Sequence, residues 1–456
     1  MAEKLIRTVD IARSPAEVFA WHAKPGALQR LTPPWESVEL VSATGGLEDG
    51  ARVEMLSRVG PFKLRWIAEH YGYEVGVQFC DCSVVGPFAR WEHCHRFEPL
   101  ENGSCRLIDE IIYELPLAPL SGLVKGAVRN RLNRMFDYRH AVTKSDLATV
   151  SQNQKHVLVS GASGFIGQAL TVFLQTQGWQ VDRLVRREVN NRSEIRWSPL
   201  EGSVEWPENY HCDAVVHLAG ANVAGGRWTK ARKMEILNSR VRGTTTLVQA
   251  LAQLEKPPEV FACGSATGFY GNTVDAATDE TAPPGAGFLA DVCVAWENAA
   301  QPIEELGTRL VQLRTGIVLS PEGGALGKML PAFKVGLGGP MGDGQQWMGW
   351  IGLSDWLRAC QFVLTHVELS GAINLTAPEP VRQKEFARIL GDVISRPTII
   401  PLPAPILRLA LGQMADEALL ASSRVLPGRL SESGFEFLHP SLEKALSYVL
   451  GRGISS

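Results

Sequence analysis

The sequence predicts an α+β domain, then an α/β domain built on a doubly wound parallel sheet, and finally a small C-terminal domain. A chain of 456 residues exceeds what one ordinary hydrophobic core contains. Its texture also changes near residue 150. There, β-rich segments give way, after the polar stretch TKSDLATVSQNQK, to an apolar strand and a glycine-rich turn. We expect domains at residues 1–147, 155–370 and 371–456, with that polar stretch as the linker.

Composition and charge argue against two classes of function. The chain has 45 Lys and Arg against 48 Asp and Glu, a net charge of −3, so it lacks the basic excess that nucleic-acid binding requires. It has no run of 18 or more apolar residues, and its N-terminus is charged where a signal peptide would be apolar. We therefore expect a soluble cytoplasmic protein with no membrane span and no nucleic-acid partner. The eight cysteines include no CxxC pair, and we expect free thiols.

The first part of the chain begins with an alternating strand, LIRTVDIA. A helix follows that Ser14 can cap, with Pro15 and Glu17 in its first turn. Strand-like segments then occupy much of residues 35–115, and a long helix is expected over 122–144. This order suits a curved antiparallel sheet wrapped round a helix, with a cavity between them.

The element order of residues 3–145 resembles the START-like (SRPBCC) or polyketide-cyclase-like ligand-binding superfamily, and the stretch FCDCSVVGPFARWEHCHRF matches its pattern. The resemblance implies an α+β helix-grip fold and an apolar cavity, but it implies no reaction. An apolar ligand in this N-terminal cavity is therefore an expected partner.

The same stretch also permits a metal site. In a hairpin around residues 86–87, Cys80 and Cys82 share one face of their strand. His93 and His95 share one face of the next strand, so four nitrogen and sulfur ligands could meet as a zinc site. Structural zinc usually uses CxxC-type spacing, and the resemblance needs no metal. We therefore favour a strand that lines the cavity and assign no metal.

At residue 156 the chain reads HVLVSGASGFIGQALTVFLQTQGWQVDRLVRR, which is a strand, a glycine-rich turn, an apolar-periodic helix and a second strand. Gly161 permits the tight turn, Gly164 lets the backbone approach a pyrophosphate, and Gly167 lets the helix pack close to the strand. The helix N-terminus supplies amide donors and a positive dipole end for the phosphates. This context predicts a Rossmann fold that contacts a dinucleotide through Gly161, Ser163, Gly164, Phe165, Ile166 and Gly167.

The second strand of this unit ends in Arg186 and Arg187, with no acidic residue there. A carboxylate at that point accepts hydrogen bonds from a ribose 2′-hydroxyl and repels a 2′-phosphate, whereas guanidinium groups do the reverse. We therefore expect NADP(H) as the cofactor; a solvated arginine pair is the alternative. A later strand, CDAVVHLAG, ends in Leu218, Ala219 and Gly220, which should pass beside the adenosine ribose.

Seven motifs occur in a characteristic order: GASGFIG, HLAGANV, GRWTKARKMEILNSRVRGTTTL, GSATGFYG, WENAA, LRTGIVLS and GDGQQWMGWIGLSD. Together they resemble the extended short-chain dehydrogenase/reductase superfamily, and within it the atypical "epimerase family protein" branch, close to human family 39U. The resemblance spans about residues 155–450 and includes a small C-terminal domain typical of the branch. It implies that Arg314, in LRTGIVLS, lies near the nicotinamide.

Working members of this superfamily use a tyrosine to give or take the proton, and a lysine four residues later lowers the pKa of that tyrosine. Leu289 and Cys293 fill these positions here; we expect both to border a water-accessible cleft, and neither can replace the pair. Ser265 lies at the position of the serine that polarises a carbonyl. The remaining acid–base candidates, each with a structural role as its alternative, are Tyr270, Asp291 and Glu297.

We interpret the chain as an NADP(H)-binding oxidoreductase or epimerase-like protein that acts on an unidentified small substrate, with an N-terminal hydrophobic-ligand-binding domain. Ser265 and Tyr270 are the catalytic candidates. The missing tyrosine and lysine favour an alternative, a non-catalytic NADPH-bound sensor or regulator. A carrier of a hydrophobic ligand is a further alternative. The sequence predicts neither the substrate nor the oligomeric state, and it leaves open whether the chain is an enzyme.

Overall fold

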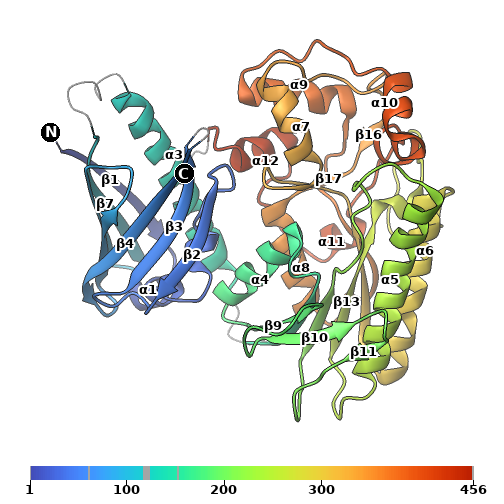
Figure 1. Cartoon of the computed structure of the whole chain (residues 1–456), viewed down its shortest axis with the longest axis horizontal. Coiled ribbons are helices and arrows are strands. Elements are labelled where there is room, and N and C mark those ends of the chain that lie inside the picture. Colours follow the sequence, from blue (N-terminus) through green and yellow to red (C-terminus); the bar gives the residue numbers. More distant parts are fainter. Residues whose placement is uncertain (1, 60–61, 117–123, 151–153, 454–456) are drawn as a thin grey trace. The chain divides into compact units, whose positions relative to one another are not determined.

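The computed structural model describes residues 2–59, 62–116, 124–150 and 154–453. The chain forms two compact units. One consists mainly of the residues up to 150, and the other consists mainly of residues 154–174 and 179–450. We call them the N-terminal unit and the α/β unit (Figure 1).

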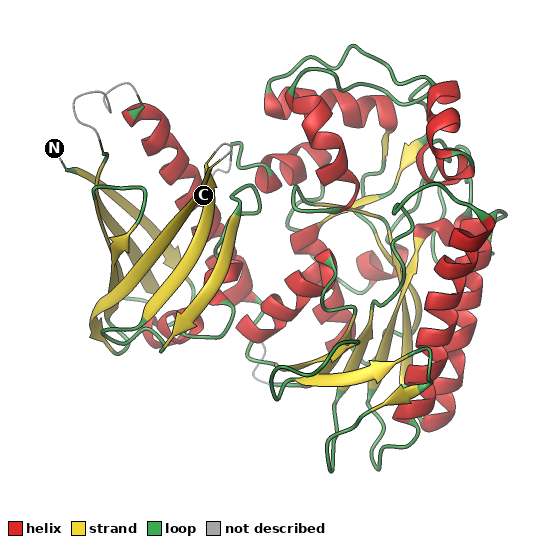
Figure 2. Ribbon diagram, in the orientation of Figure 1, coloured by secondary structure: helices red, strands yellow, loops and turns green. Residues whose placement is uncertain are grey.

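The N-terminal unit is a curved, seven-stranded antiparallel sheet with a long helix, α3, against one face, which we call the inner face (Figures 1 and 2). The strand order is β1-β7-β6-β5-β4-β3-β2. The strands are β1 (Glu3–Ile11), β2 (Val38–Thr44), β3 (Arg52–Val59), β4 (Phe62–Glu74), β5 (Gln78–Val85), β6 (Arg90–Pro99) and β7 (Cys105–Glu114). The helices are α1 (Pro15–His22), α2 (Ala27–Arg30) and α3 (Lys125–Ala148).

Apolar side chains of α3 and of the sheet form the core of this unit. Phe136 of α3 packs with Leu5, Trp91, Ile111 and Tyr113, and all five are buried. These four strand residues come from β1, β6 and β7, which are neighbours in the sheet. The helix-grip arrangement predicted from the element order is therefore confirmed.

The ends of two helices test the local predictions. Ser14 caps α1 as predicted, because its side chain accepts a hydrogen bond from the Glu17 amide while Glu17 bonds back to the Ser14 amide. The linker prediction is wrong over residues 143–148, which form the last part of α3. Asp146 is buried there, and Arg30 donates two hydrogen bonds of 2.9 Å to its carboxylate. The polar composition of this segment therefore suggested a linker, although one of its residues forms a buried ion pair. Residues 122–123 of the predicted long helix lie outside the described residues.

A disulfide joins two of the cysteines that we expected to be free thiols. Cys80 of β5 and Cys94 of β6 are direct cross-strand partners and are bonded to each other. Because successive side chains of a strand point to opposite faces, both lie on the face opposite to Asp81 and His93. The four-ligand zinc site is therefore wrong, because its cysteines and its histidines occupy opposite faces of the sheet.

The α/β unit contains a doubly wound sheet in the order β11-β10-β9-β8-β12-β13-β14-β18. All neighbours are parallel except β10 and β11. The direction in which strands are added reverses between β8 and β12, which is where ligands bind in such sheets. The strands are β8 (His156–Ser160), β9 (Gln180–Val185), β10 (Glu194–Ser198), β11 (Ser203–Val204), β12 (Ala214–His217), β13 (Val260–Ala266), β14 (Arg309–Thr315) and β18 (Gly371–Leu375).

Helices cover both faces of this sheet (Figure 2). On one face, α4 (Phe165–Thr176) and α8 (Leu353–Thr365) pack on Val159 and Val311. On the other face, α5 (Lys230–Leu251) and α6 (Phe288–Ala300) pack on Phe261. The predicted Rossmann-type α/β fold is therefore confirmed.

Along the chain, the remaining elements lie between the later strands of this sheet or after its last strand. Residue 371, where the C-terminal domain is predicted to begin, is the first residue of β18, the last strand of the sheet. In the described ranges, no helix has both the length and the apolar character needed to cross a membrane. The smaller elements are η2 (Thr267–Tyr270), η3 (Gln301–Leu306), β15 (Ile317–Leu319), α7 (Gly324–Lys334), β16 (Trp347–Met348), β17 (Trp350–Gly352), β19 (Val381–Arg382), α9 (Gln383–Ile394), α10 (Ala404–Leu411), η4 (Ala415–Leu419), α11 (Gly428–Glu432) and α12 (Leu442–Val449).

Candidate functional site

The glycine-rich turn between β8 and α4 is shaped by close backbone contacts. Gly161 has a φ of +70°, and a Cβ there would lie 2.8 Å from the carbonyl carbon of Leu218. A Cβ on Gly167 would lie 2.2 Å from the Gly161 oxygen, and one on Gly164 would lie 3.2 Å from the same atom. Any side chain at 161 or 167 would therefore push the turn away from its neighbours. The first-turn amides of α4, which have no partner within the helix, stay at the carboxyl edge of the sheet.

A buried hydrogen-bond network fixes the adjacent ends of β8 and β12. The Ser160 hydroxyl lies 2.6 Å from His217 Nδ1 and accepts hydrogen bonds from the Leu218 and Ala219 amides at 3.2 and 3.3 Å. His217 Nε2 lies 3.1 Å from the Thr244 hydroxyl. Burial lowers the pKa of His217 to about 3, so this imidazole is neutral. The network holds Leu218 and Ala219 against Gly161, so the residues predicted to contact the adenosine ribose lie beside the turn predicted to contact the pyrophosphate.

The two arginines after β9 differ in their surroundings, although both are exposed. Arg187 donates hydrogen bonds of 2.9 and 2.7 Å to the two carboxylate oxygens of Glu194, the first residue of β10. These bonds, first among several causes, lower the pKa of Glu194 to about 2. No ion pair of Arg186 is found among the described residues. The sequence did not reveal this pair, because Glu194 reaches Arg187 from the next strand.

Three polar side chains lie next to one another at the carboxyl ends of adjacent strands. Ser265 of β13 is the register partner of Arg314 of β14, and Arg314 is the partner of Asn374 of β18. Each is the second-last residue of its strand, and all three are buried. Parallel strands bring these positions to one edge of the sheet, where doubly wound proteins bind their ligands.

Glu297 joins this row from α6. Arg314 donates to both of its carboxylate oxygens, Nε to Oε1 and Nη2 to Oε2, each at 2.8 Å. The Ser265 hydroxyl donates to Oε1 at 2.6 Å. The side chains of Arg314 and Glu297 are only 6% and 7% exposed, so this is a buried, bidentate ion pair. Burial opposes the charge of Arg314, but the hydrogen bonds that Arg314 donates to Glu297 prevail and raise the pKa of Arg314.

Tyr270 extends the network on the other side of Arg314. Its hydroxyl accepts a hydrogen bond from Arg314 Nη1 at 2.9 Å and donates to Asn374 Oδ1 at 2.7 Å. The Arg314 guanidinium carbon lies 3.4 Å from the ring centroid of Phe269, a cation–π contact. Burial, the largest cause, raises the pKa of Tyr270. The single hydroxyl hydrogen of Tyr270 is committed to Asn374, so none is free for a substrate.

The position of the absent lysine is buried, although we expected it to border a water-accessible cleft. Cys293 is 4% exposed and belongs to an apolar cluster with Phe269, Tyr270 and Val425. Burial raises the pKa of its thiol to about 11, so it is neither a nucleophile nor a base near neutral pH. Leu289 is half-buried against another apolar cluster. The expectation is wrong for Cys293, because α6 packs its side chain against η2 and Val425.

Several residues of the site escaped sequence reasoning. Asn374 and Glu280 are buried, and Glu280 accepts a 2.9 Å hydrogen bond from the Asn374 amide. Arg240 of α5 lies against Gly220, where a Cβ would come within 3.1 Å of its guanidinium carbon. No local pattern marks these three. Asp291, by contrast, was a candidate but is exposed on α6, and among the described residues its carboxylate has no hydrogen bond or ion pair with the network.

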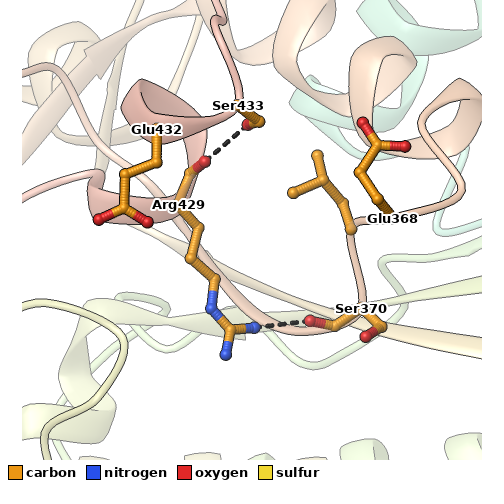
Figure 3. Close-up of a pocket in the computed structure, with 6 residues that line it drawn as sticks. Glu368, Ser370, Arg429, Glu432 and Ser433 are labelled. Carbon is orange, nitrogen blue, oxygen red and sulfur yellow. Dashed lines mark hydrogen bonds between the residues drawn. The ribbon is translucent and has the colours of Figure 1, made fainter.

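A separate pocket of about 380 Å³ lies where the amino ends of the strands meet, on the side of the sheet opposite to the carboxyl ends (Figure 3). Glu368 and Ser370 precede the first residue of β18, and Arg429 of α11 donates a 2.6 Å hydrogen bond to the Ser370 carbonyl. Since β18 runs parallel to its neighbour β14, this amino end is opposite to the edge that carries Ser265 and Gly161. The pocket is therefore not part of the candidate site.

Three family models match the chain. One described as the NAD dependent epimerase/dehydratase family matches residues 157–375, and one described as polyketide cyclase / dehydrase and lipid transport matches residues 11–138. A domain of unknown function, DUF1731, matches residues 402–449.

Relatives and solved structures agree with these matches. Epimerase family protein Mb2239 of Mycobacterium bovis is 43% identical over 296 residues, which are 65% of this chain and 98% of that protein. The crystal structure of a nucleoside-diphosphate sugar epimerase from Corynebacterium glutamicum superposes with a TM-score of 0.78 at 30% identity, covering 98% of this chain and 90% of that one. Human SDR39U1, crystallised with NADPH, gives 0.60 at 32% identity, covering 65% of this chain and 99% of that one. The chain therefore belongs to the SDR39U1-type epimerase family of NAD-dependent epimerases and dehydratases, and it carries an N-terminal domain of the polyketide cyclase type.

Proposed function

We propose that the α/β unit binds NADP(H) at the glycine-rich turn and is an oxidoreductase or epimerase for a small, hydroxyl-bearing substrate beside Ser265. The turn supports the cofactor: side chains at Gly161 and Gly167 would meet backbone atoms at 2.2 to 2.8 Å, and the first turn of α4 presents amides to a phosphate. Arg186 can pair with a 2′-phosphate. Human SDR39U1, a relative, was crystallised with NADPH.

The observation that carries the proposed activity is the hydrogen bond from Ser265 to Glu297. Because the Ser265 hydroxyl donates its hydrogen to Glu297 Oε1 at 2.6 Å, its oxygen is left to accept a hydrogen bond from a substrate hydroxyl. A substrate proton can then pass to Ser265 while the Ser265 proton passes to Glu297. The nicotinamide, when bound, supplies hydride transfer at the carbon that bears this hydroxyl. Ser265 and Glu297 thus take the acid–base role of the absent tyrosine and lysine.

The other members of the network position this pair. Arg314 holds both oxygens of Glu297, and Tyr270 and Asn374 hold the far side of Arg314. We therefore assign Ser265 as the catalytic residue that touches substrate, and Tyr270 as a positioning residue. A hydroxyl-bearing substrate also agrees with the relative described as a nucleoside-diphosphate sugar epimerase.

A second candidate function is a non-catalytic, NADPH-bound sensor. The burial of Cys293 and the absence of the tyrosine and lysine favour it.

For the N-terminal unit, we propose a small apolar ligand. The inner face supports this with a group of aromatic rings, in which Phe19 contacts Tyr73, Phe79 and Phe97 with centroids 5.3 to 6.1 Å apart.

Calorimetry and a substrate panel test the proposal. NADPH binding is measured first, and nicotinamide oxidation or reduction is then followed with nucleoside-diphosphate sugars and simple alcohols and ketones. We expect Ser265→Ala to retain NADPH affinity but to lose turnover by a factor of about 10² to 10⁴. Ser203→Ala, an exposed serine of β11, is the matched control and should change neither.

The outcomes separate the two candidates. Full turnover by Ser265→Ala, or failure of the chain to bind either NADPH or NADH, would overturn the proposed activity. Tight NADPH binding without hydride exchange on any substrate of the panel would instead support the sensor.

A further inference from the structure

The inner face of the N-terminal unit carries a buried group of charged and imidazole side chains. Sheet register assembles it: Asp81 of β5 is the cross-strand partner of His93 of β6, and His95 of β6 is the partner of Asp109 of β7. His140 of α3 approaches from the helix, with Nε2 2.6 Å from Asp109 Oδ2. All of these are buried except Asp81, which is 16% exposed.

His93 lies between the two carboxylates. Its Nε2 is 3.0 Å from Asp109 Oδ1, and its Nδ1 is 3.2 Å from Asp81 Oδ2. A neutral imidazole has only one N–H, so one of its nitrogens would present a lone pair to a buried carboxylate. A positive charge is therefore required at this position, and either a second proton or a metal cation can supply it.

His95 has a ring nitrogen without a hydrogen bond. Its Nδ1 is 2.7 Å from Asp109 Oδ1, yet the geometry is not that of a hydrogen bond, and Nδ1 has no hydrogen bond to any described residue. The ring centroids of His95 and His93 are 4.0 Å apart. A histidine binds a metal ion through the lone pair of a ring nitrogen.

We propose that Asp81, His93 and His95 form a binding site for one divalent transition-metal ion, of which zinc is the representative. One ligand atom from each residue lies within 4.8 Å of the others. Two atoms that each lie about 2.0 Å from a tetrahedral zinc are about 3.3 Å apart, close to the 3.2 Å between His93 Nδ1 and Asp81 Oδ2. The other ligand atoms lie up to 4.8 Å apart, so side-chain rotation has to bring them together around one ion. Two imidazoles and a carboxylate suit such ions rather than Ca²⁺ or Mg²⁺.

The surroundings complete this site. Asp109 holds His93 through Nε2 and so turns Nδ1 towards Asp81, an arrangement that orients metal-binding histidines in known proteins. His140 occupies the second oxygen of Asp109, and Trp91 Nε1 donates to Asp81 Oδ1 at 3.1 Å. Three protein ligands leave a fourth position on a tetrahedral ion, as in catalytic zinc sites. The site thus offers a metal to which an oxygen of a bound small molecule can attach.

This ligand set differs from the one that the sequence suggested. The cysteines drop out because Cys80 and Cys94 form a disulfide on the other face. Asp81, which lies between Cys80 and Cys82, takes their place, because it shares the inner face with His93. The disulfide joins the residue before Asp81 to the residue between His93 and His95, so it ties together the two strands that carry the ligands.

Metal analysis of the untagged full-length chain tests the site. The protein is stripped with a chelator, dialysed against Zn²⁺ and then against metal-free buffer, and its zinc content is measured by mass spectrometry. We expect about one zinc ion per chain, and a Co²⁺ complex with the visible absorption of a tetrahedral site. Asp81→Asn and His95→Asn should each weaken zinc affinity by more than about 100-fold, with far-ultraviolet circular dichroism used to confirm that each variant is folded.

Two matched controls carry the same substitutions at exposed positions. Asp10→Asn on β1 and His211→Asn in the α/β unit should bind zinc like the parent chain. Zinc content well below one per chain in the unmodified protein would overturn the site, and this result does not depend on the folding of any variant. Equal zinc binding by the folded Asp81→Asn, His95→Asn and control chains would overturn it as well.

Discussion

Replacement of Glu297 by glutamine tests the buried ion pair at the centre of the candidate site. The substitution keeps the shape of the side chain and removes its charge. It leaves the Arg314 guanidinium, whose side chain is 6% exposed, without the carboxylate that now accepts two of its hydrogen bonds at 2.8 Å. Removal of one partner of a buried pair costs about 3 to 5 kcal/mol. Because glutamine retains one acceptor oxygen, we expect about 3 kcal/mol of destabilisation, at the lower end of that range.

Differential scanning calorimetry can locate this loss. In a unit of this size, 1 kcal/mol lowers the Tm by about 2 °C, so the transition of the α/β unit should fall by about 6 °C. The transition of the N-terminal unit should not move. The control is Glu235→Gln, which breaks the exposed pair of Arg232 and Glu235, whose glutamate is 58% exposed. There we expect a change of at most about 0.5 kcal/mol.

A double variant separates charge from packing. In Glu297→Leu with Arg314→Met, no charge remains buried, so part of the stability lost in Glu297→Gln should return. If Glu297→Gln were as harmless as Glu235→Gln, the pair would not be desolvated in solution. The reasoning that places a held carboxylate beside Ser265 would then fail.

Three further predictions concern the cofactor, the α6 helix and pH. Arg186→Ala should reduce the NADPH-over-NADH preference by about tenfold, or 1.4 kcal/mol, and Arg187→Ala should reduce it less, because Glu194 already holds that guanidinium; equal effects by calorimetry would contradict this. Leu289→Tyr with Cys293→Lys should destabilise the α/β unit by more than about 3 kcal/mol, because a lysine charge would enter an apolar cluster; an unchanged Tm would refute it. The pKa of His217 is about 3 in the folded chain and about 6.5 in the unfolded chain. As the pH falls below about 6.5, the unfolded state therefore binds a proton that the folded state does not bind. The free energy of unfolding then decreases by up to about 1.4 kcal/mol per pH unit. The free energy of unfolding is measured with urea between about pH 6 and pH 5. Its dependence on pH should be smaller in His217→Gln by the equivalent of about one proton, and an unchanged pH dependence would exclude this role.

The parts of this protein that the sequence predicts well depend on backbone requirements within a few residues. Gly161 and Gly167 are needed where a Cβ would strike backbone at 2.8 and 2.2 Å, and such positions leave a readable glycine pattern. Alternation and helical periodicity predicted the antiparallel sheet with its helix and the Rossmann fold. Ser14 and Glu17 were readable as a capping box for the same reason, since the partners are three residues apart.

Where the sequence misled, the deciding partner was distant in the chain. Asp146 reads as part of a polar linker until Arg30, 116 residues earlier, is seen to pair with it. From the sequence Arg187 is expected to be an unpaired cation, but in the structure Glu194 of the neighbouring strand forms an ion pair with it. Composition records how polar a segment is, but it does not record whether a second charge is brought to it.

The sequence by itself determined the fold class, the cofactor turn and the candidate serine, because each follows from local backbone geometry or from motifs in a fixed order. Only the tertiary structure decided what surrounds that serine and what lies inside the N-terminal unit. Ser265, Arg314 and Asn374 meet because three parallel strands align their second-last residues. Asp81, and not Cys82, contacts His93, because the register of the β5–β6 hairpin places Asp81 and His93 on the same face of the sheet. Side-chain chemistry is written in the sequence, but strand register determines which side chains become neighbours, and in a sheet a shift of one residue reverses the face on which each of them lies.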